Sequence, residues 1–279
     1  MKQNKNLIKM KKQNKKKIIL VGYKSFIQKN LFKYLSKNFL IKKIKFNEIK
    51  NIKIEDYDLI INCSNSKNFY LKKYKKKYDR NLEIANMIKN TGIKLFLLSS
   101  RQVYSPKLLL TERSKLKPIN IYSNNCIKSE KNCKKILNND LLILRLSNVF
   151  GYENGKKKRP SLVSIILKSL KKKEIIFDNN YFLYKDFLPI NLLCLYIESL
   201  VKLNITGIIN IGSGIPILVK DFVKKVIDIK KIRIKVRLSE GFYDKSYSYN
   251  ISKLKKLTGI EINKKKLNVY FSQLKNKLI

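Results

Sequence analysis

The amino-acid sequence predicts an α/β fold in which a doubly wound parallel sheet is followed by a smaller C-terminal lobe. Short apolar runs alternate with longer segments of helical periodicity over the first 150 residues. Parallel neighbouring strands need a crossover connection, and the intervening helical segments supply one. Beyond Gly151 the alternation loosens, which indicates a second lobe attached to the first.

The apolar run at 17–22 is predicted to be the first strand, because it is short and passes directly into a helical pattern. Further apolar runs predict strands at 39–46, 58–64, 93–100, 141–149 and 207–214. A long lysine-rich helix is predicted over about 67–91, ending at Gly92. A proline-containing loop then leads to the helix that carries Tyr122.

These elements divide the chain into three parts. Residues 1–16 are predicted to be a basic disordered tail, because lysine dominates the segment. Residues 17–150 are predicted to form the sheet domain. Residues 151–279 are predicted to form the smaller lobe, some elements of which return to the first domain.

The formal charge of +44 raises the question of a nucleic-acid partner. Lysine outnumbers arginine 56 to 7 and is spread along the whole chain, whereas nucleic-acid recognition favours arginine and a local basic stripe. Composition bias is therefore the favoured interpretation, and nucleic-acid binding stays the alternative. A structure with one contiguous basic face would support that alternative.

Several functional classes are excluded or disfavoured by composition. The chain has no histidine, which excludes Ser-His-Asp and Cys-His catalysis as well as His-ligated metals, and no metal site is predicted. The four cysteines lack CxxC spacing and are expected to be reduced. No apolar run is long enough to span a bilayer and no signal-peptide pattern is present, so we expect a soluble, cytoplasmic protein without a membrane partner.

A set of segments carries the functional signal. The first strand leads into the turn of "ILVGYKSFIQKNL", where glycine allows a backbone to approach a pyrophosphate at a helix N-terminus. Downstream, the chain contains in order "DLIINCSN", "FLLSSRQVYS", "LTERSKLKPINIYSNN", "LRLSNVFG", "LYKDFLPINLL", "GIINIGSG" and "YNISKLKKLTG".

Taken in this order, the segments resemble the extended short-chain dehydrogenase/reductase family, the NAD-dependent epimerases, dehydratases and reductases of nucleotide sugars. The likeness covers about 17–279 and implies a Rossmann-like sheet with a substrate-binding lobe. It implies NAD or NADP as the cofactor and a nucleotide sugar as the substrate. A homodimer built through the helix that carries Tyr122 is also common in the family.

The resemblance assigns roles to individual positions. The catalytic positions that it implies are Tyr122, Ser100 and Cys126, the last standing where the family has lysine. The cofactor contacts that it implies are Gly22, Ser25, Phe26, Ile27, Asn62, Cys63, Ser64 and Ser99. The substrate contacts that it implies are Asn148 and Lys185. Glu130 and Arg145 also match family positions.

The chain departs from the family pattern at cofactor-contacting positions. Ser25 and Gln28 replace the second and third glycines of the family's turn. No acidic residue ends the second strand, where Lys43, Lys45 and Asn47 stand instead. A lysine there favours the 2′-phosphate of NADP, although the abundance of lysine is the simpler explanation.

The replacement of lysine by Cys126 bears directly on catalysis. The ordinary pKa of tyrosine is about 10, and a lysine one helical turn away would lower it by its positive charge. A neutral thiol cannot do this, and Lys128 lies six residues from Tyr122, on another face of the helix.

Two main hypotheses follow from these observations. The first is an NAD(P)-dependent epimerase, dehydratase or reductase of a nucleotide-activated sugar, serving surface-polysaccharide synthesis, with Tyr122 as the acid/base and Ser100 bonded to the substrate oxygen. The second is a catalytically impaired relative that binds a sugar nucleotide, a protein or RNA.

Overall fold

The computed structural model describes residues 15–153, 162–163, 165–166, 173–177, 179–227, 233–237 and 245–278. The predicted disordered tail, residues 1–16, lies outside the described residues except for its last two positions. Within the described ranges, no helix combines the length and the apolar character that crossing a membrane requires.

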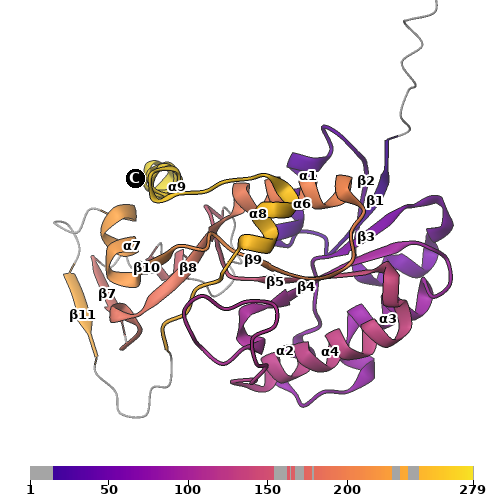
Figure 1. Cartoon of the computed structure of the whole chain (residues 1–279), viewed down its shortest axis with the longest axis horizontal. Helices are drawn as coiled ribbons and strands as arrows, with labels where there is room; N and C mark the ends of the chain where they lie inside the picture. Colours follow the sequence, from indigo (N-terminus) through magenta and orange to yellow (C-terminus); the bar gives the residue numbers. More distant parts are fainter. Residues whose placement is uncertain are drawn as a thin grey trace, which may run out of the picture.

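Six parallel strands form the central sheet, in the order β2-β1-β3-β4-β5-β9 (Figure 1). The strands are β1 (Lys17–Val21), β2 (Leu40–Ile44), β3 (Leu59–Asn62), β4 (Lys94–Ser100), β5 (Leu141–Leu146) and β9 (Gly207–Ile211). The predicted parallel, doubly wound sheet is therefore confirmed. The chain runs from β1 outward to β2 and then crosses back to β3, from which it continues in the other direction to β4. The topological switch point therefore lies between β1 and β3.

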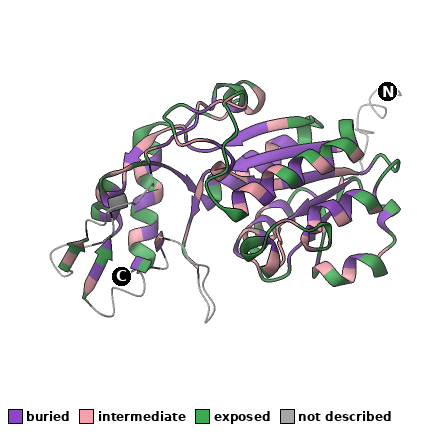
Figure 2. Ribbon diagram, turned by 90° about the horizontal axis from the view of Figure 1, so that it is seen from below, coloured by how far each residue is buried: buried purple, intermediate pink, exposed green. Residues whose placement is uncertain are grey.

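Helices cover both faces of this sheet (Figure 1). One face carries α1 (Phe26–Leu35), α6 (Ile190–Leu203) and α8 (Ser252–Thr258), and the other carries α2 (Lys67–Leu71), α3 (Arg80–Met87) and α4 (Ile121–Leu137). Alternate β1 side chains enter two separate cores, Ile18 and Leu20 one, Ile19 and Val21 the other. Both faces of the strand are thus buried, as a doubly wound sheet requires (Figure 2).

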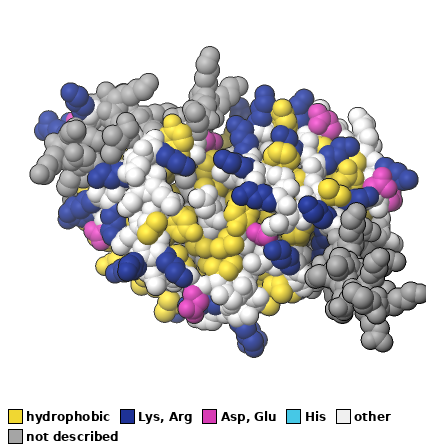
Figure 3. All heavy atoms as spheres, turned by 90° about the horizontal axis from the view of Figure 1, so that it is seen from above, with side chains coloured by type: hydrophobic (Ala, Val, Ile, Leu, Met, Phe, Trp, Pro, Cys, Tyr) yellow, Lys and Arg dark blue, Asp and Glu magenta, His cyan; other side chains and the backbone are white. Residues whose placement is uncertain are grey.

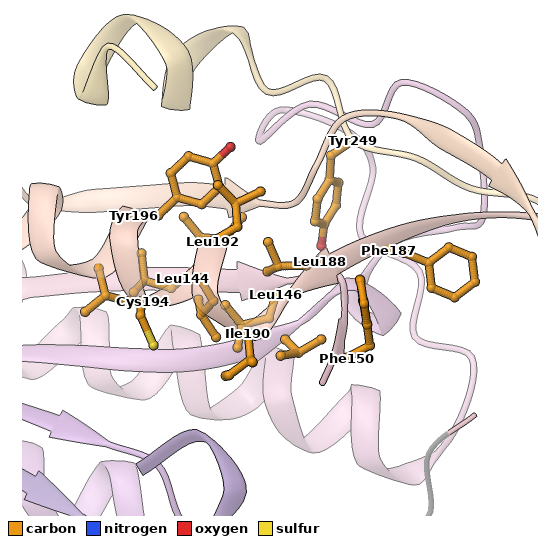
Figure 4. Close-up of a cluster of buried hydrophobic side chains, with 14 of the residues drawn as sticks. Leu144, Leu146, Phe150, Phe187, Leu188, Ile190, Leu192, Cys194, Tyr196 and Tyr249 are labelled. Atoms are coloured by element: carbon orange, nitrogen blue, oxygen red, sulfur yellow. The ribbon is translucent and has the colours of Figure 1, made fainter. Parts of the chain in front are cut away.

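The core on the α6 side is continuous with the second lobe. Figure 4 shows side chains of α6, among them Cys194, facing Leu144 and Leu146 of β5. The same cluster extends through aromatic rings, with Phe187 stacked on Phe222 at a centroid distance of 4.2 Å. The lobes therefore share one apolar core.

The second lobe consists of two small sheets with helices. Its elements are β6 (Asn148–Phe150), β7 (Glu174–Phe177), β8 (Tyr184–Pro189), β10 (Pro216–Leu218), β11 (Arg233–Val236), α7 (Val219–Val226) and α9 (Lys264–Leu278). In the part of the chain that the structure describes, the short 3-10 helices are η1 (Phe46–Asn51), η2 (Ile54–Asp56), η3 (Lys76–Tyr78), η4 (Arg101–Val103), η5 (Asn138–Asp140) and η6 (Asn179–Phe182).

The predicted single helix over 67–91 is wrong, because the chain forms two helices there with η3 between them. Five lysines between positions 72 and 77 place like charges on neighbouring turns, which disfavours a continuous helix. The Asn125 amide donates to the carbonyls of Phe69 (2.9 Å) and Lys72 (2.8 Å) at the end of α2. Asp79 then caps α3 as a new start.

A buried carboxylate ties the second lobe to the sheet domain. Asp186 of β8 accepts hydrogen bonds from the backbone N–H groups of Ser213 (2.8 Å), Gly214 (2.9 Å) and Tyr249 (3.3 Å). The hydroxyls of Ser147 and Ser213 also donate to it. One fully buried side chain therefore fixes the turn after β9, the turn after β5 and the segment before α8.

We expect Asp186→Ala to lower the free energy of unfolding by about 3 kcal/mol or more, because each buried donor left unpaired costs about 1–3 kcal/mol. Urea denaturation followed by circular dichroism measures this change. Asp56→Ala, at an exposed position, is the control and should stay within about 0.5 kcal/mol of the parent. Equal unfolding midpoints for the two variants would contradict the assigned role of Asp186.

Candidate active site

The turn after β1 lies close to the end of β3. Gly22 has a φ of +114°, and a Cβ atom at this position would lie 3.0 Å from the carbonyl atoms of Cys63 and from the Cβ of Ser64. Glycine is required there both by the backbone conformation and by the approach of the two strand ends. The loops that follow β1 and β3 therefore share one edge of the sheet.

The two residues that replace the family's glycines take different roles. Ser25 caps α1, and its hydroxyl accepts the backbone N–H of Gln28 at 3.2 Å. Gln28 is almost completely buried, and its amide nitrogen has no hydrogen-bond partner among the described residues. Phe26 is buried and Ile27 half-buried at the start of the helix.

The end of β3 is held by amide hydrogen bonds. The Asn62 carbonyl oxygen accepts both the backbone N–H and the hydroxyl of Ser64, at 3.0 and 3.1 Å, while its amide donates to Asn81 at 2.7 Å. Asn62 is buried, whereas Cys63 and Ser64 line the adjoining cavity. In this geometry Asn62 positions the two residues that follow it.

A cavity of about 520 Å³ lies at the topological switch point, between the turns that follow β1, β2 and β3. Its lining includes the aromatic rings of Tyr23, Phe46 and Tyr70 and the cations Lys24, Lys45 and Arg80. Of these side chains, only Lys45 was singled out from the sequence. Among the described lining residues there is no carboxylate. The open carboxyl end of a doubly wound sheet is where nucleotides bind in such folds.

Tyr122 lies in the first turn of α4, enclosed by aromatic rings. The ring of Tyr70 stacks on it at a centroid distance of 4.8 Å, and Phe69 meets it edge-on at 6.2 Å. Burial is the main cause that raises the pKa of Tyr122 well above its ordinary value, and Cys126 and Tyr70 raise it further. A hydrogen bond with Ser100 acts in the opposite direction.

Cys126 gives this tyrosine no cation. Its side chain is buried, and burial raises the pKa of the thiol to about 12, so the thiol is neutral at physiological pH. The ammonium of Lys128 lies over the ring of Tyr74, 5.7 Å from its centroid, as its position on the helix predicts. Neither Cys126 nor Lys128 therefore places a positive charge beside Tyr122.

Behind the site, a buried polar network connects three parallel strands to α4. Ser99 at the end of β4 donates to Glu130 of α4, which forms an ion pair with Arg145 of β5 at 2.6 Å. The guanidinium also donates to the Tyr104 hydroxyl at 2.6 Å, which in turn donates to Asn210 of β9 at 2.8 Å. The ion pair is 3% and 6% exposed at its two side chains. This network fixes the rotation of α4 and hence the position of Tyr122.

On the side of the second lobe, the predicted substrate residues lie beside an arginine. Arg101 follows Ser100 directly, and its Nε donates to the side-chain oxygen of Asn148 at 3.3 Å. Its guanidinium lies 3.9 Å from the centroid of the Tyr247 ring, and the buried Lys185 approaches the same ring at 5.5 Å. A second cavity of about 520 Å³ opens here between the loop after β4 and Lys245.

The sequence held a signal for some of the residues that were missed. Arg80 and Arg101 are two of only seven arginines in a lysine-rich chain. An arginine in such a chain indicates a position at which a planar guanidinium makes contacts that an ammonium cannot. Tyr70 and Tyr247 carried no such signal, because their roles depend on ring contacts made across the fold.

Exposed lysines lie on both lobes. They occur on α1 and β2 of the sheet domain and on α8 and α9 near the C-terminus. On the face shown in Figure 3, Lys and Arg side chains are scattered across the described surface. This distribution counts against a single nucleic-acid-binding face and favours composition bias.

The chain belongs to the NAD dependent epimerase/dehydratase family, whose model matches residues 19–188, more than half of the chain. This finding confirms the resemblance noted from the sequence motifs. The search of curated proteins returns no match to this sequence.

Solved structures of this fold class overlay on nearly the whole chain. A dTDP-glucose 4,6-dehydratase from Bacillus anthracis in complex with NAD has a TM-score of 0.76 at 18% identity, covering 94% of this chain and 96% of its own. The RMD protein of Pseudomonas aeruginosa, complexed with NADPH, has a TM-score of 0.76 at 16% identity, with 94% and 99% covered. A dTDP-4-dehydrorhamnose reductase from Clostridium acetobutylicum has a TM-score of 0.76 at 15% identity, with 94% and 99% covered.

We expect Glu130→Gln to lower the free energy of unfolding by about 3–5 kcal/mol, because it leaves the buried Arg145 without its counter-charge. Glu83→Gln is the matched control, since Glu83 pairs with Lys50 at 3.3 Å on the surface and such pairs contribute about 0–1 kcal/mol. Urea denaturation of both variants measures the difference. Similar small losses for both would show that the buried network does not organise this region.

Proposed function

We propose that the protein is a nicotinamide-dependent reductase of a nucleotide-linked keto sugar, in which Tyr122 acts as the proton donor. The observation that carries this proposal is the position of Tyr122, half-buried between the rings of Phe69 and Tyr70 and beside the neutral thiol of Cys126. A site without a cation next to its tyrosine keeps the phenol protonated.

The direction of proton transfer follows from the pKa of Tyr122. With the ordinary pKa of about 10, roughly one tyrosine in a thousand is ionised at pH 7, and the raised pKa makes the phenolate scarcer still. A reaction that begins by removing a hydroxyl proton needs that phenolate. A reaction that ends by protonating an oxygen uses the phenol, which is the populated form.

Dehydration of a sugar is a less favoured reaction for this site, because the two carboxylates near Tyr122 are already engaged in other contacts. Eliminating water requires a general base that removes a proton from carbon and an acid for the leaving hydroxyl. Glu130 is held by Arg145 and Ser99, and Asp79 accepts the Tyr74 and Ser129 hydroxyls while capping α3. Neither carboxylate is available for that chemistry.

The cofactor assignment rests on the fit of the cavity at the switch point. Gly22 lets the turn approach the end of β3, and the cationic and aromatic lining suits an adenine nucleotide. A reduced nicotinamide, when bound, supplies hydride to a carbonyl carbon. Tyr122 would donate its hydroxyl proton to the carbonyl oxygen, with Ser100 beside it, so that the phenol O–H bond breaks as the new hydroxyl forms. The phenolate left on Tyr122 would then regain a proton from water, as its raised pKa favours.

The nucleotide-sugar substrate is proposed from the family and supported by charge on the second-lobe side. Arg101 and Lys185 bring two cations to the neighbourhood of Asn148, where the diphosphate of a nucleotide sugar requires positive charge. One overlaid structure is named as a reductase of a nucleotide-linked dehydro sugar. Surface-polysaccharide synthesis in the cytoplasm remains the proposed setting.

A homodimer through α4 remains a prediction that the surface of the helix does not favour. Lys128, Lys131 and Lys135 are exposed at helical spacing, so they form one stripe along α4. Two copies packed through this helix would bring these like charges together.

A second candidate is a binding protein without redox chemistry. Ser25 occupies the N-terminus of α1 with its own side chain, which removes one backbone donor from a bound pyrophosphate. Calorimetric titration with the four nicotinamide dinucleotides separates the two candidates, because a folded protein that binds none of them cannot be a reductase of this kind.

Under the reductase proposal, Tyr122→Phe should lower the rate of keto-sugar reduction by about 100-fold or more, the usual contribution of a positioned general acid. The assay follows loss of reduced cofactor over a panel of nucleotide-linked keto sugars. Tyr184→Phe, at an exposed tyrosine, is the control and should retain the parent rate. An unchanged rate in Tyr122→Phe would remove this residue from the reaction.

The pH dependence of the reductive rate should show that no cation lies beside Tyr122. A raised pKa keeps the donor form of Tyr122 present up to and beyond its ordinary value, so the reductive rate should lose nothing to tyrosine ionisation between about pH 6 and pH 9. Cys126→Lys should lower the pKa of Tyr122, which brings the loss of the donor form to lower pH and makes the oxidative direction measurable. Cys126→Ala is the uncharged control and should keep the parent profile. A parent profile that already falls near pH 7 would contradict the assignment.

A further inference from the structure

The cavity at the switch point has a distribution of charge that discriminates between the two nicotinamide dinucleotides. They differ by one phosphate on the 2′-oxygen of the adenosine ribose, which adds up to two negative charges. In doubly wound folds that bind NAD, a carboxylate about 20 residues after the first glycine accepts the 2′-hydroxyl, and a cation there accommodates the 2′-phosphate. The residues after β2 are therefore the ones to compare with this rule.

Lys45 is the first residue after β2, and it lines the cavity with Phe46 and Asn47. Its ammonium lies 5.9 Å from the centroid of the Tyr23 ring, on the turn after β1. The Lys24 ammonium approaches the same ring at 5.3 Å. Two cations from different turns thus converge on one aromatic ring at the rim of the cavity.

The neighbouring carboxylate, Glu48, is already engaged. It accepts the backbone N–H of Lys45 at 2.8 Å and lies 3.4 Å from the ammonium of the same residue. It does not line the cavity. A ribose hydroxyl would have to displace these bonds to reach the carboxylate, whereas a phosphate needs only the cations.

Arg80, the first residue of α3, adds a third cation to the lining of the cavity. Its guanidinium stacks over the ring of Phe46 at 4.6 Å and donates to the backbone carbonyl of Asn65 at 3.4 Å. The stacking holds a charge beside the segment that follows β2, while the exposed lysines lie at the rim. A dianionic group bound here would lie in a cavity lined by three cations and no carboxylate among the described lining residues.

Building on the proposed function, we propose that this cavity recognises the 2′-phosphate of NADP(H) and discriminates against NAD(H), with Lys45 as the main determinant and Lys24 and Arg80 in support. The aromatic walls of Tyr23 and Phe46 supply stacking surface for the adenine. This assignment replaces the explanation that Lys45 merely reflects the abundance of lysine.

The test is calorimetric titration of the full chain with NADPH, NADH, 2′,5′-ADP and 5′-ADP. We expect NADPH to bind at least about tenfold more tightly than NADH, a difference of about 1.4 kcal/mol. 2′,5′-ADP should bind more tightly than 5′-ADP. Both compounds lack the nicotinamide and carry two phosphate groups, but only 2′,5′-ADP places one of them on the 2′-oxygen. Equal affinity for NADPH and NADH would overturn this inference and leave the proposed reductase standing.

Charge-reversal variants test whether Lys45 causes the preference for NADPH over NADH. Lys45→Glu should weaken NADPH binding by about tenfold or more and remove most of the preference over NADH. Lys43→Glu is the matched control, since Lys43 lies in the same strand and its ammonium stands over the ring of Phe32, 4.1 Å from the centroid, outside the cavity. An equal loss in both variants would show a general effect of net charge and overturn the assignment to Lys45.

Two further outcomes separate this inference from the function on which it rests. If a folded protein binds neither dinucleotide yet prefers 2′,5′-ADP over 5′-ADP, the phosphate site stands and the reductase proposal fails. If 3′,5′-ADP binds as tightly as 2′,5′-ADP, the site does not distinguish a phosphate on the 2′-oxygen from one on the 3′-oxygen. That result would overturn the assignment to NADP(H).

Discussion

The buried ion pair between Glu130 and Arg145 is the interaction on which the candidate site depends. Taking two charges out of water costs several kcal/mol per ion, so such a pair is stable only when further hydrogen bonds complete it. Here Ser99 donates to the carboxylate, and the guanidinium reaches the Tyr104 hydroxyl. The result is a rigid link from α4 to β4 and β5, which sets where Tyr122 stands relative to Ser100.

The same physics makes Glu130 and Arg145 depend on each other for stability. Removing either member of the buried pair leaves a charge without a partner, so both are retained for stability whether or not a reaction takes place. The position of Cys126 carries no such constraint, because a small buried thiol fills the space without an electrostatic cost. The presence of Glu130 and Arg145 is therefore explained by the stability of the fold, whether or not Tyr122 takes part in a reaction.

The sequence was sufficient for those features that local pattern determines. The strands of the sheet are short, apolar and separated by crossovers, and Gly22 marks a turn that only glycine fits, so both were predictable. The break between α2 and α3 was not, because it depends on the Asn125 amide reaching the end of α2 from more than fifty residues away. The stacking of Tyr70 on Tyr122 depends on that same break, since it places α2 against α4. Tertiary contacts of this kind leave no periodic trace in the chain.

Arginine and lysine occupy different kinds of position in this protein. Lysine fills exposed positions on both lobes, where a flexible, well-hydrated ammonium is tolerated almost anywhere. Three of the seven arginines instead lie flat on aromatic rings, Arg80 on Phe46, Arg101 on Tyr247 and Arg145 on Tyr104. These three positions are the wall of the nucleotide cavity, the second-lobe side of the site and the buried network between them. A planar guanidinium that packs against an aromatic ring keeps its direction better than an exposed, flexible ammonium does. These three arginines therefore hold their charge at fixed places in the fold, whereas most lysines lie on the surface.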